Sequence, residues 1–239
     1  YHVQDSGDLV SETNATASIG GTDLVYSYLS SYTLGANVEN GRILATGAAN
    51  LTGNTLNNVL YAGAGSNVLN GGTGIDTVSY AYGLAGTSGV TVSLAVSTAQ
   101  ATGGSGSDTL TSIENLIGSA YADRLTGNTG ANSLAGGAGS DTLDGGAGSD
   151  TLAGGDGSDT YVVRDGGDVV SETNAVLATG GSDTVYSSLA AYTLTANVEN
   201  GRILATVAAN LTGNTLNNVL YAGAGNNGLN AGSGNDTDY

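Results

Sequence analysis

The sequence lacks cysteine, proline, methionine, tryptophan and phenylalanine, and these absences narrow what the chain can be. Without cysteine the chain has no disulfide and no thiolate zinc site. Tyrosine is its one aromatic residue type, and the other hydrophobic residues are spread thinly as Leu, Val and Ala, so a thick central core cannot form. We therefore expect a thin core that runs along a repeated structure.

Positive charge is also scarce. Four Arg and no Lys stand against 21 acidic residues, which gives a net charge of −17. Nucleic acids and anionic membranes are bound through clusters of Lys and Arg, so neither is expected as a partner. No apolar run approaches the ~18 residues of a membrane span, which argues against membrane insertion. Metal cations are the expected counterions.

The sequence gives no support for catalysis within the chain. His2 is the one histidine, so a Ser or Cys nucleophile paired with a His base is not expected. The Asp residues recur every nine positions, which is typical of metal ligands or solvated turns and not of a unique acid and base pair. We predict that the chain is not an enzyme.

Two levels of repetition organise the chain. Residues 1–79 recur without a gap as residues 161–239, and most of the aligned pairs are identical. We predict a degenerate repeat block over 1–79, a linking strand and loop with an isolated nonapeptide over 80–117, and a regular nonapeptide block over 118–171. The second copy, 161–239, overlaps the end of that block. Because both ends cut through a repeat, we expect the parent protein to continue as a longer array.

Within the long repeat lies a nine-residue period. Positions one to six form a turn rich in Gly, where a positive φ costs little, and positions seven to nine form a short strand. Position eight is expected to point inward and to stack on the next coil. It is occupied by Leu60, Leu69, Val78, Leu110, Leu125, Leu134, Leu143, Leu152, Tyr161 and Val170. This pattern predicts an all-β solenoid.

The period is interrupted in two ways. Neighbouring Asp residues are spaced by 15 instead of nine at Asp8 to Asp23, Asp108 to Asp123 and Asp168 to Asp183, which predicts a longer excursion at one corner of the coil. From Tyr80 to Thr102 the nonapeptide disappears, and alternating apolar residues predict a longer strand and a loop beside the solenoid.

The tandem blocks of the form GGxGxDxUx that begin at Gly136, Gly145 and Gly154 resemble the RTX (repeats-in-toxin, haemolysin-type calcium-binding) nonapeptide, as found in large secreted bacterial adhesins and surface proteins. The resemblance implies a right-handed parallel β-roll with inserted loops. It also implies Ca²⁺ as the bound ion, type I secretion of the unfolded chain, and folding outside the cell, where calcium is abundant.

The resemblance further implies where calcium is held. One ion lies between one turn and the next but one, bound by the position-six side chains of both and by main-chain carbonyls of the Gly-rich turns. The implied pairs are Asp123 with Asp141, Asn132 with Asp150, Asp141 with Asp159, and Asp150 with Asp168. The turn glycines are Gly136, Gly137, Gly139, Gly145, Gly146, Gly148, Gly154, Gly155 and Gly157. Asp76 and Asp108 are candidate ligands outside this block.

Other repeats depart from the motif. Asn replaces Asp at position six at Asn58, Asn67, Asn218 and Asn227, and we expect these side chains to hydrogen-bond along the solenoid without a metal. Glu39, Glu114 and Glu199 lie in matching contexts and are expected to bind neighbouring backbone groups or a further ion.

We therefore predict a calcium-binding structural segment of a large secreted or surface-exposed bacterial protein, such as an adhesin, a surface layer or an extracellular filament. Neighbouring copies of the repeat are possible partners in an array or fibre. Two alternatives remain open. One is a non-catalytic C-terminal secretion and folding module of a type I-secreted hydrolase or epimerase, and the other is a solenoid that binds ice or a polysaccharide through its row of Thr.

Overall fold

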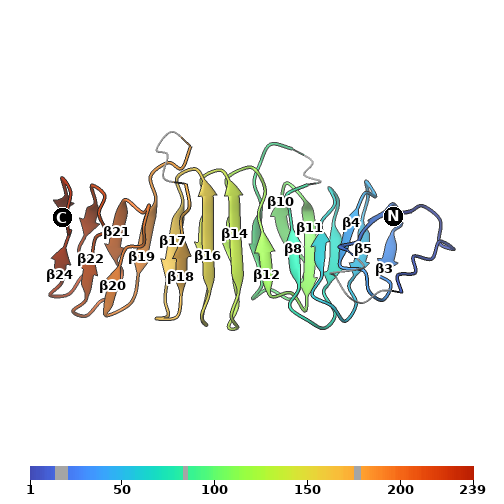
Figure 1. Cartoon of the computed structure of the whole chain (residues 1–239), viewed down its shortest axis with the longest axis horizontal. Helices are drawn as coiled ribbons and strands as arrows, with labels where there is room; N and C mark the ends of the chain where they lie inside the picture. Colours follow the sequence, from blue (N-terminus) through green and yellow to red (C-terminus); the bar gives the residue numbers. More distant parts are fainter. Residues whose placement is uncertain (14–20, 83–85, 175–178) are drawn as a thin grey trace. The chain divides into compact units, whose positions relative to one another are not determined.

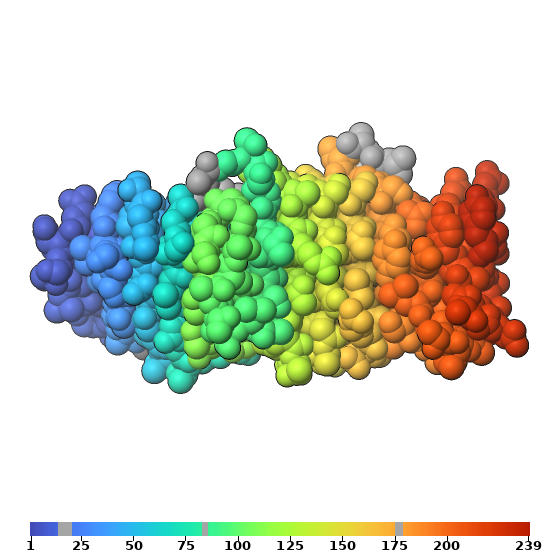
Figure 2. Space-filling model, turned by 180° about the vertical axis from the view of Figure 1, so that it is seen from behind, coloured from blue at the N-terminus to red at the C-terminus, as the bar shows by residue number. Residues whose placement is uncertain are grey.

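The computed structural model describes residues 1–13, 21–82, 86–174 and 179–239. Strands make up all the regular secondary structure of these residues, which confirms the predicted all-β class. The chain divides into two compact units, Tyr1–Ser119 and Ala120–Tyr239, and each is a parallel β-solenoid (Figure 1). In the space-filling view, the coils of each unit follow one another as bands in sequence order (Figure 2).

The described residues of unit 1 form twelve strands. They are β1 (His2–Val3), β2 (Leu24–Ser27), β3 (Ser31–Thr33), β4 (Asn40–Ile43), β5 (Ala49–Thr52), β6 (Val59–Tyr61), β7 (Asn67–Asn70), β8 (Thr77–Ser79), β9 (Thr91–Ser93), β10 (Gln100–Gly103), β11 (Gly106–Thr111) and β12 (Asn115–Ile117). One sheet has the order β1-β2-β4-β6-β8-β12, and the other has the order β10-β11-β7-β5-β3. All neighbours in these two sheets are parallel except β10 and β11.

In unit 2, thirteen strands lie within the residues that the structure describes. They are β13 (Arg124–Thr126), β14 (Ser133–Ala138), β15 (Thr142–Asp144), β16 (Thr151–Asp156), β17 (Thr160–Val163), β18 (Val169–Ser171), β19 (Thr184–Ser187), β20 (Ala191–Thr193), β21 (Asn200–Ile203), β22 (Asn210–Thr212), β23 (Val219–Tyr221), β24 (Gly228–Asn230) and β25 (Thr237–Asp238). The parallel rows are β13-β15-β17-β19-β21-β23-β25, β14-β16-β18 and β20-β22-β24.

The strand register confirms that two nonapeptides make one coil. Leu134 pairs with Leu152, and Leu125 with Leu143, so in the regular nonapeptide block each strand lies beside the strand 18 residues further on. Because strand side chains alternate between the two faces, this register places every position-eight side chain over its counterpart in the next coil. All ten predicted position-eight residues are buried. They form the thin core between the two rows of strands.

The predicted excursions are confirmed at two of the three intervals. His2 pairs with Tyr26 and Thr160 with Thr184, so parallel pairing continues across Asp8 to Asp23 and Asp168 to Asp183 with a register of 24 residues. Residues 14–20 and 175–178, inside these intervals, lie outside the described residues. The prediction is wrong for Asp108 to Asp123, because that interval contains a further strand, β12.

The segment from Tyr80 to Thr102 departs from the nonapeptide as predicted, but the strand in it is short. Val90 and Val92 are buried, whereas Val96 is exposed and β9 ends at Ser93. The segment continues into β10, which pairs antiparallel with β11 and forms a hairpin. Residues 83–85 of this segment lie outside the described residues.

Candidate metal centre

Glycine allows the turns to follow the tight path between strands. In the three regular repeats, the glycines at positions two and four have positive φ; examples are Gly146 at 92° and Gly148 at 125°. Side chains other than hydrogen are disfavoured there. A Cβ on Gly146 would also collide with the carbonyl oxygen of Asn128 in the preceding coil. The turns therefore stack closely, with backbone oxygens directed at the neighbouring coil.

Each position-six side chain directly precedes a strand and reaches back to the coil before it. Oδ1 of Asp141 accepts a hydrogen bond from the backbone N–H of Asp123 at 2.8 Å, and Oδ1 of Asp159 accepts one from Asp141 at 2.8 Å. On the other side of the coil, the N–H of Asn132 donates to Asp150 at 2.8 Å, and that of Asp150 donates to Asp168 at 3.2 Å. The structure thus brings together all four pairs that the sequence predicted.

The second carboxylate oxygen of these Asp residues is the feature that points to a cation. Within the described part of the chain, Oδ2 of Asp76, Asp141, Asp150 and Asp159 is buried and has no hydrogen-bond partner. In each case this oxygen lies against the position-one glycine of its own turn, where a Cβ would collide with it. An unsatisfied buried carboxylate oxygen costs several kcal/mol unless a proton or a metal ion binds it. The glycine keeps the space beside it free of a side chain.

Burial also changes the acidity of these groups. The pKa of Asp141 is raised to about 7, chiefly by burial and in addition by the nearby carboxylates of Asp159 and Asp123. Burial likewise raises the pKa of Asp159 to about 6 and shifts those of Asp150 and Asp76 upward. In the absence of a cation, these buried carboxyl groups are therefore harder to ionise than an exposed Asp.

Two predicted ligands have different surroundings. Oδ1 of Asp108 accepts a hydrogen bond from the N–H of Asn67 at 2.8 Å, and its Oδ2 accepts one from the hydroxyl of Thr102 at 3.0 Å. Both oxygens of Asp168 also accept backbone hydrogen bonds, Oδ1 from Asp150 and Oδ2 from Arg164 at 3.0 Å. A cation at Asp108 or Asp168 would therefore share oxygens that already have partners.

The three predicted glutamates bind backbone groups. Oε2 of Glu39 accepts a hydrogen bond from the N–H of Asp23 at 2.9 Å, and Oε2 of Glu199 accepts one from Asp183 at 2.8 Å. Glu114 makes the same contact with Asp76 at 2.8 Å. The predicted binding of backbone groups is thus confirmed. The row of hydrogen bonds between carboxylates and backbone N–H groups therefore continues into coils that lack the regular nonapeptide.

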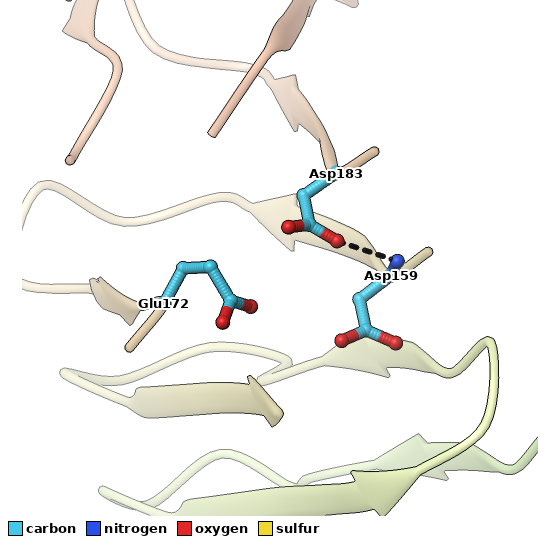
Figure 3. A group of neighbouring side chains, drawn as sticks. All are labelled: Asp159, Glu172 and Asp183. Carbon is cyan, nitrogen blue, oxygen red and sulfur yellow. Dashed lines mark hydrogen bonds between the residues drawn. The ribbon is translucent and has the colours of Figure 1, made fainter. Parts of the chain in front are cut away.

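One cluster of carboxylates was not predicted from the sequence. Asp159, Glu172 and Asp183 are all buried, and one oxygen of each lies within 4.8 Å of the others (Figure 3). Glu172 and Asp183 do not fall on the nonapeptide pattern. The sequence does single out these two residues through the long repeat, because they recur as Glu12 and Asp23 in the first copy.

The RTX calcium-binding nonapeptide repeat matches the chain in four copies, over residues 45–78, 113–143, 136–170 and 210–238. These matches cover just over half of the sequence. The chain belongs to the RTX calcium-binding nonapeptide repeat family. No curated protein matches it. The isolated nonapeptide at Gly103 lies outside the matched residues.

Calcium fits the residues of this RTX segment. It is a hard cation that takes six to eight oxygen ligands at flexible geometry. Carboxylates with an unpartnered oxygen, together with carbonyls exposed by glycine turns, offer that kind of donor set at Asp141, Asp150 and Asp159. A bound ion would neutralise the carboxylates that face each other between coils.

Proposed function

We propose that this RTX segment is a calcium-binding structural element of a large secreted or surface-exposed bacterial protein, and that calcium drives its folding outside the cell. The observation that carries this proposal is the set of buried Asp carboxylates, each with one oxygen that lacks a partner among the described residues. The regular nonapeptide block, 118–171, is the main calcium-binding region.

The coupling to folding follows from the small core. Each coil buries about two apolar side chains, whereas ordering the backbone costs ~1–2 kcal/mol per residue. The net charge of −17 adds repulsion, which is concentrated where Asp carboxylates face each other. Binding of calcium only to the folded chain would offset both costs.

The location follows from the affinity expected of such sites. Extracellular calcium modules have Kd values of roughly 10⁻⁴ to 10⁻³ M, so they fill outside the cell and stay empty in the calcium-poor cytosol. A chain that stays unfolded until export suits type I secretion. Among the described residues, no helix is long and apolar enough to cross a membrane.

A structural role also agrees with the surroundings of the one histidine. The ring of His2 stacks on that of Tyr26, with centroids 4.8 Å apart, and lies 6.1 Å from that of Tyr28. The Asp residues are distributed along repeated turns and do not converge on one cleft. The long internal repeat favours an array within an adhesin, surface layer or filament over a single tail on a hydrolase.

The test is a calcium titration followed by far-UV circular dichroism, with magnesium as the control ion. We expect a coil-to-β transition at about millimolar calcium, its absence with magnesium, and a shift to higher calcium in the D141A/D150A double variant. Full β structure in excess chelator would show that folding does not depend on calcium.

A further inference from the structure

Three carboxylates meet in unit 2 at the last regular turn, which contains one of them. Asp159 precedes β17, Glu172 follows β18 and Asp183 precedes β19, so the three come from different segments of the coil (Figure 3). Their side chains are 1%, 6% and 1% exposed, respectively. One oxygen of each lies within 4.8 Å of the others, which is close enough for a single ion to contact all three.

The hydrogen bonds around the cluster hold the carboxylates in place but do not reach the buried Oδ2 of Asp159. Oδ1 of Asp183 accepts a hydrogen bond from the N–H of Asp159 at 2.7 Å, and Oε1 of Glu172 accepts one from that of Asn174 at 3.0 Å. Oδ1 of Asp159 is taken by the N–H of Asp141 at 2.8 Å. Oδ2 of Asp159 is buried and has no partner among the residues that the structure describes.

Oδ2 of Asp159 lies on the side of that carboxylate that faces Glu172. A Cβ on Gly154 would collide with both Oδ2 of Asp159 and the hydroxyl of Tyr161, so these two oxygens are neighbours. That hydroxyl donates a hydrogen bond to Oε2 of Glu172 at 2.7 Å. Oδ2 of Asp159 is therefore directed into the cluster, and the tyrosine proton is already committed to Glu172.

The nearby positive charge does not neutralise the cluster. Arg164, which lies between Asp159 and Glu172 in the sequence, forms a bidentate ion pair with Asp144 at 2.7 and 3.0 Å. Three buried carboxylates within contact distance of one another repel strongly unless a cation joins them.

We propose that Asp159, Glu172 and Asp183 form a further calcium site of this segment. This inference rests on the calcium binding proposed above, but it lies outside the nonapeptide motif, since Glu172 and Asp183 are outside the residues matched by the family. Three carboxylates in place of two bind calcium more tightly, because affinity rises with the number of charged ligands. The site holds the coil that contains the 15-residue interval against the last regular turn.

The first copy of the long repeat provides a matched control. There the hydroxyl of Tyr1 donates a hydrogen bond to Oε2 of Glu12 at 3.2 Å, as that of Tyr161 does to Glu172. Asp23 corresponds to Asp183, and the 239-residue chain used in the test has no residue at the position that corresponds to Asp159. In this chain, the Glu12→Gln variant removes the same charge from the matching position without touching the proposed site.

The deciding experiment compares calcium binding by the wild-type chain, E172Q and E12Q, using equilibrium dialysis for stoichiometry and calorimetry for affinity. Glutamine keeps an acceptor for the Tyr161 hydroxyl and removes the charge. We expect E172Q to lose one tight site, or to bind there at least about tenfold more weakly, while E12Q matches the wild type. Circular dichroism at saturating calcium checks that each variant folds.

A second variant and a second ion keep the test decisive. D183N should lose the same site, and it decides the matter if E172Q does not fold. Terbium at this site should emit when Tyr161 is excited, and E172Q should lose that signal. An unchanged number and affinity of ions in both variants would overturn this site and leave the turn sites standing. A wild-type chain that binds no calcium would instead overturn the proposed function.

Discussion

Asn58 and Asp141 occupy the same position of the nonapeptide, one in each unit, and both are buried. Oδ1 of Asn58 accepts a hydrogen bond from the N–H of Asn54 in its own turn at 2.7 Å. Its Nδ2 donates to the carbonyls of Val38 and Glu39 in the preceding coil at 3.0 and 3.1 Å. The amide thus satisfies its own hydrogen-bonding groups and binds one coil to the next.

The side chain of Asp141 has no N–H with which to reach the equivalent carbonyls of its own preceding coil. Its Oδ1 accepts a hydrogen bond from the preceding coil, and its Oδ2 has no partner among the described residues. Asn218 in the second copy repeats the contacts of Asn58, with donor distances of 3.2 and 3.1 Å. The amide of an Asn turn thus satisfies its own hydrogen-bonding groups, whereas an Asp turn leaves one buried oxygen that a proton or a cation would have to satisfy.

Removal of calcium should produce the largest difference between the Asp turns and the Asn turns. At an ion concentration 100 times Kd, each site stabilises the folded chain by about 2.7 kcal/mol, so a few sites together approach the whole stability of a domain, about 5–15 kcal/mol. As calcium is lowered towards the midpoint of the folding transition, amide hydrogen exchange should lose protection first in residues 118–171 and last around Asn58 and Asn67. Equal loss at both kinds of turn would contradict the comparison.

A change of pH should have the second-largest effect on stability, and the effect should come from the Asp turns and not from the Asn turns. The folded-state pKa values of Asp141, Asp159 and Asp183 are about 7, 6 and 7, above the ordinary value of 3.8. The folded chain therefore binds protons more tightly than the unfolded chain. Without calcium, the stability that these three groups contribute is fully present below about pH 4 and is lost as the pH rises through 6 to 7.

Circular dichroism in chelator measures this effect, and β structure should increase as the pH falls from about 8 to 5. A D141N/D159N/D183N variant serves as the control, because it lacks the titrating groups and should show a flatter profile. A wild-type signal that is independent of pH over this range would refute the prediction.

Replacing Asn58 by Asp should convert a metal-free turn into one that needs a cation. The change removes the amide donors to Val38 and Glu39 and buries a charge, so it should lower the calcium-free unfolding free energy by about 1–3 kcal/mol. Thermal unfolding with and without calcium measures the loss. N57D is the control, because Asn57 accepts a hydrogen bond through Oδ1 from Ile75, and this acceptor is kept.

The reciprocal change should have the smallest effect on stability. The D141N/D150N variant should gain about 1 kcal/mol per turn without calcium, because each new amide can donate to the preceding coil. The same variant should bind fewer ions in equilibrium dialysis. D144N is its control, since Asp144 pairs with Arg164 and should leave the number of ions unchanged. A variant that keeps its full number of ions would argue against Asp141 and Asp150 as ligands.

Blocks that share the nonapeptide motif do not all have the same structure. The block that begins at Gly103 has the letters of the regular turn, but Gly103 pairs with Gly106 in the antiparallel hairpin of β10 and β11. Its positive φ angles fall on positions one and four instead of two and four. Pairing with β10 therefore determined this turn, and a nine-residue motif does not contain that information.

The sequence by itself determined the period, the inward position of the core side chains and the Asp pairs of residues 118–171. These follow from local spacing, because a fixed nine-residue step places like residues over one another in every coil. Only the tertiary structure decided the position of β12 and the meeting of Asp159, Glu172 and Asp183. Those residues come from both sides of a coil that is lengthened by an insertion, so their distance depends on how the coil closes and not on their spacing along the chain.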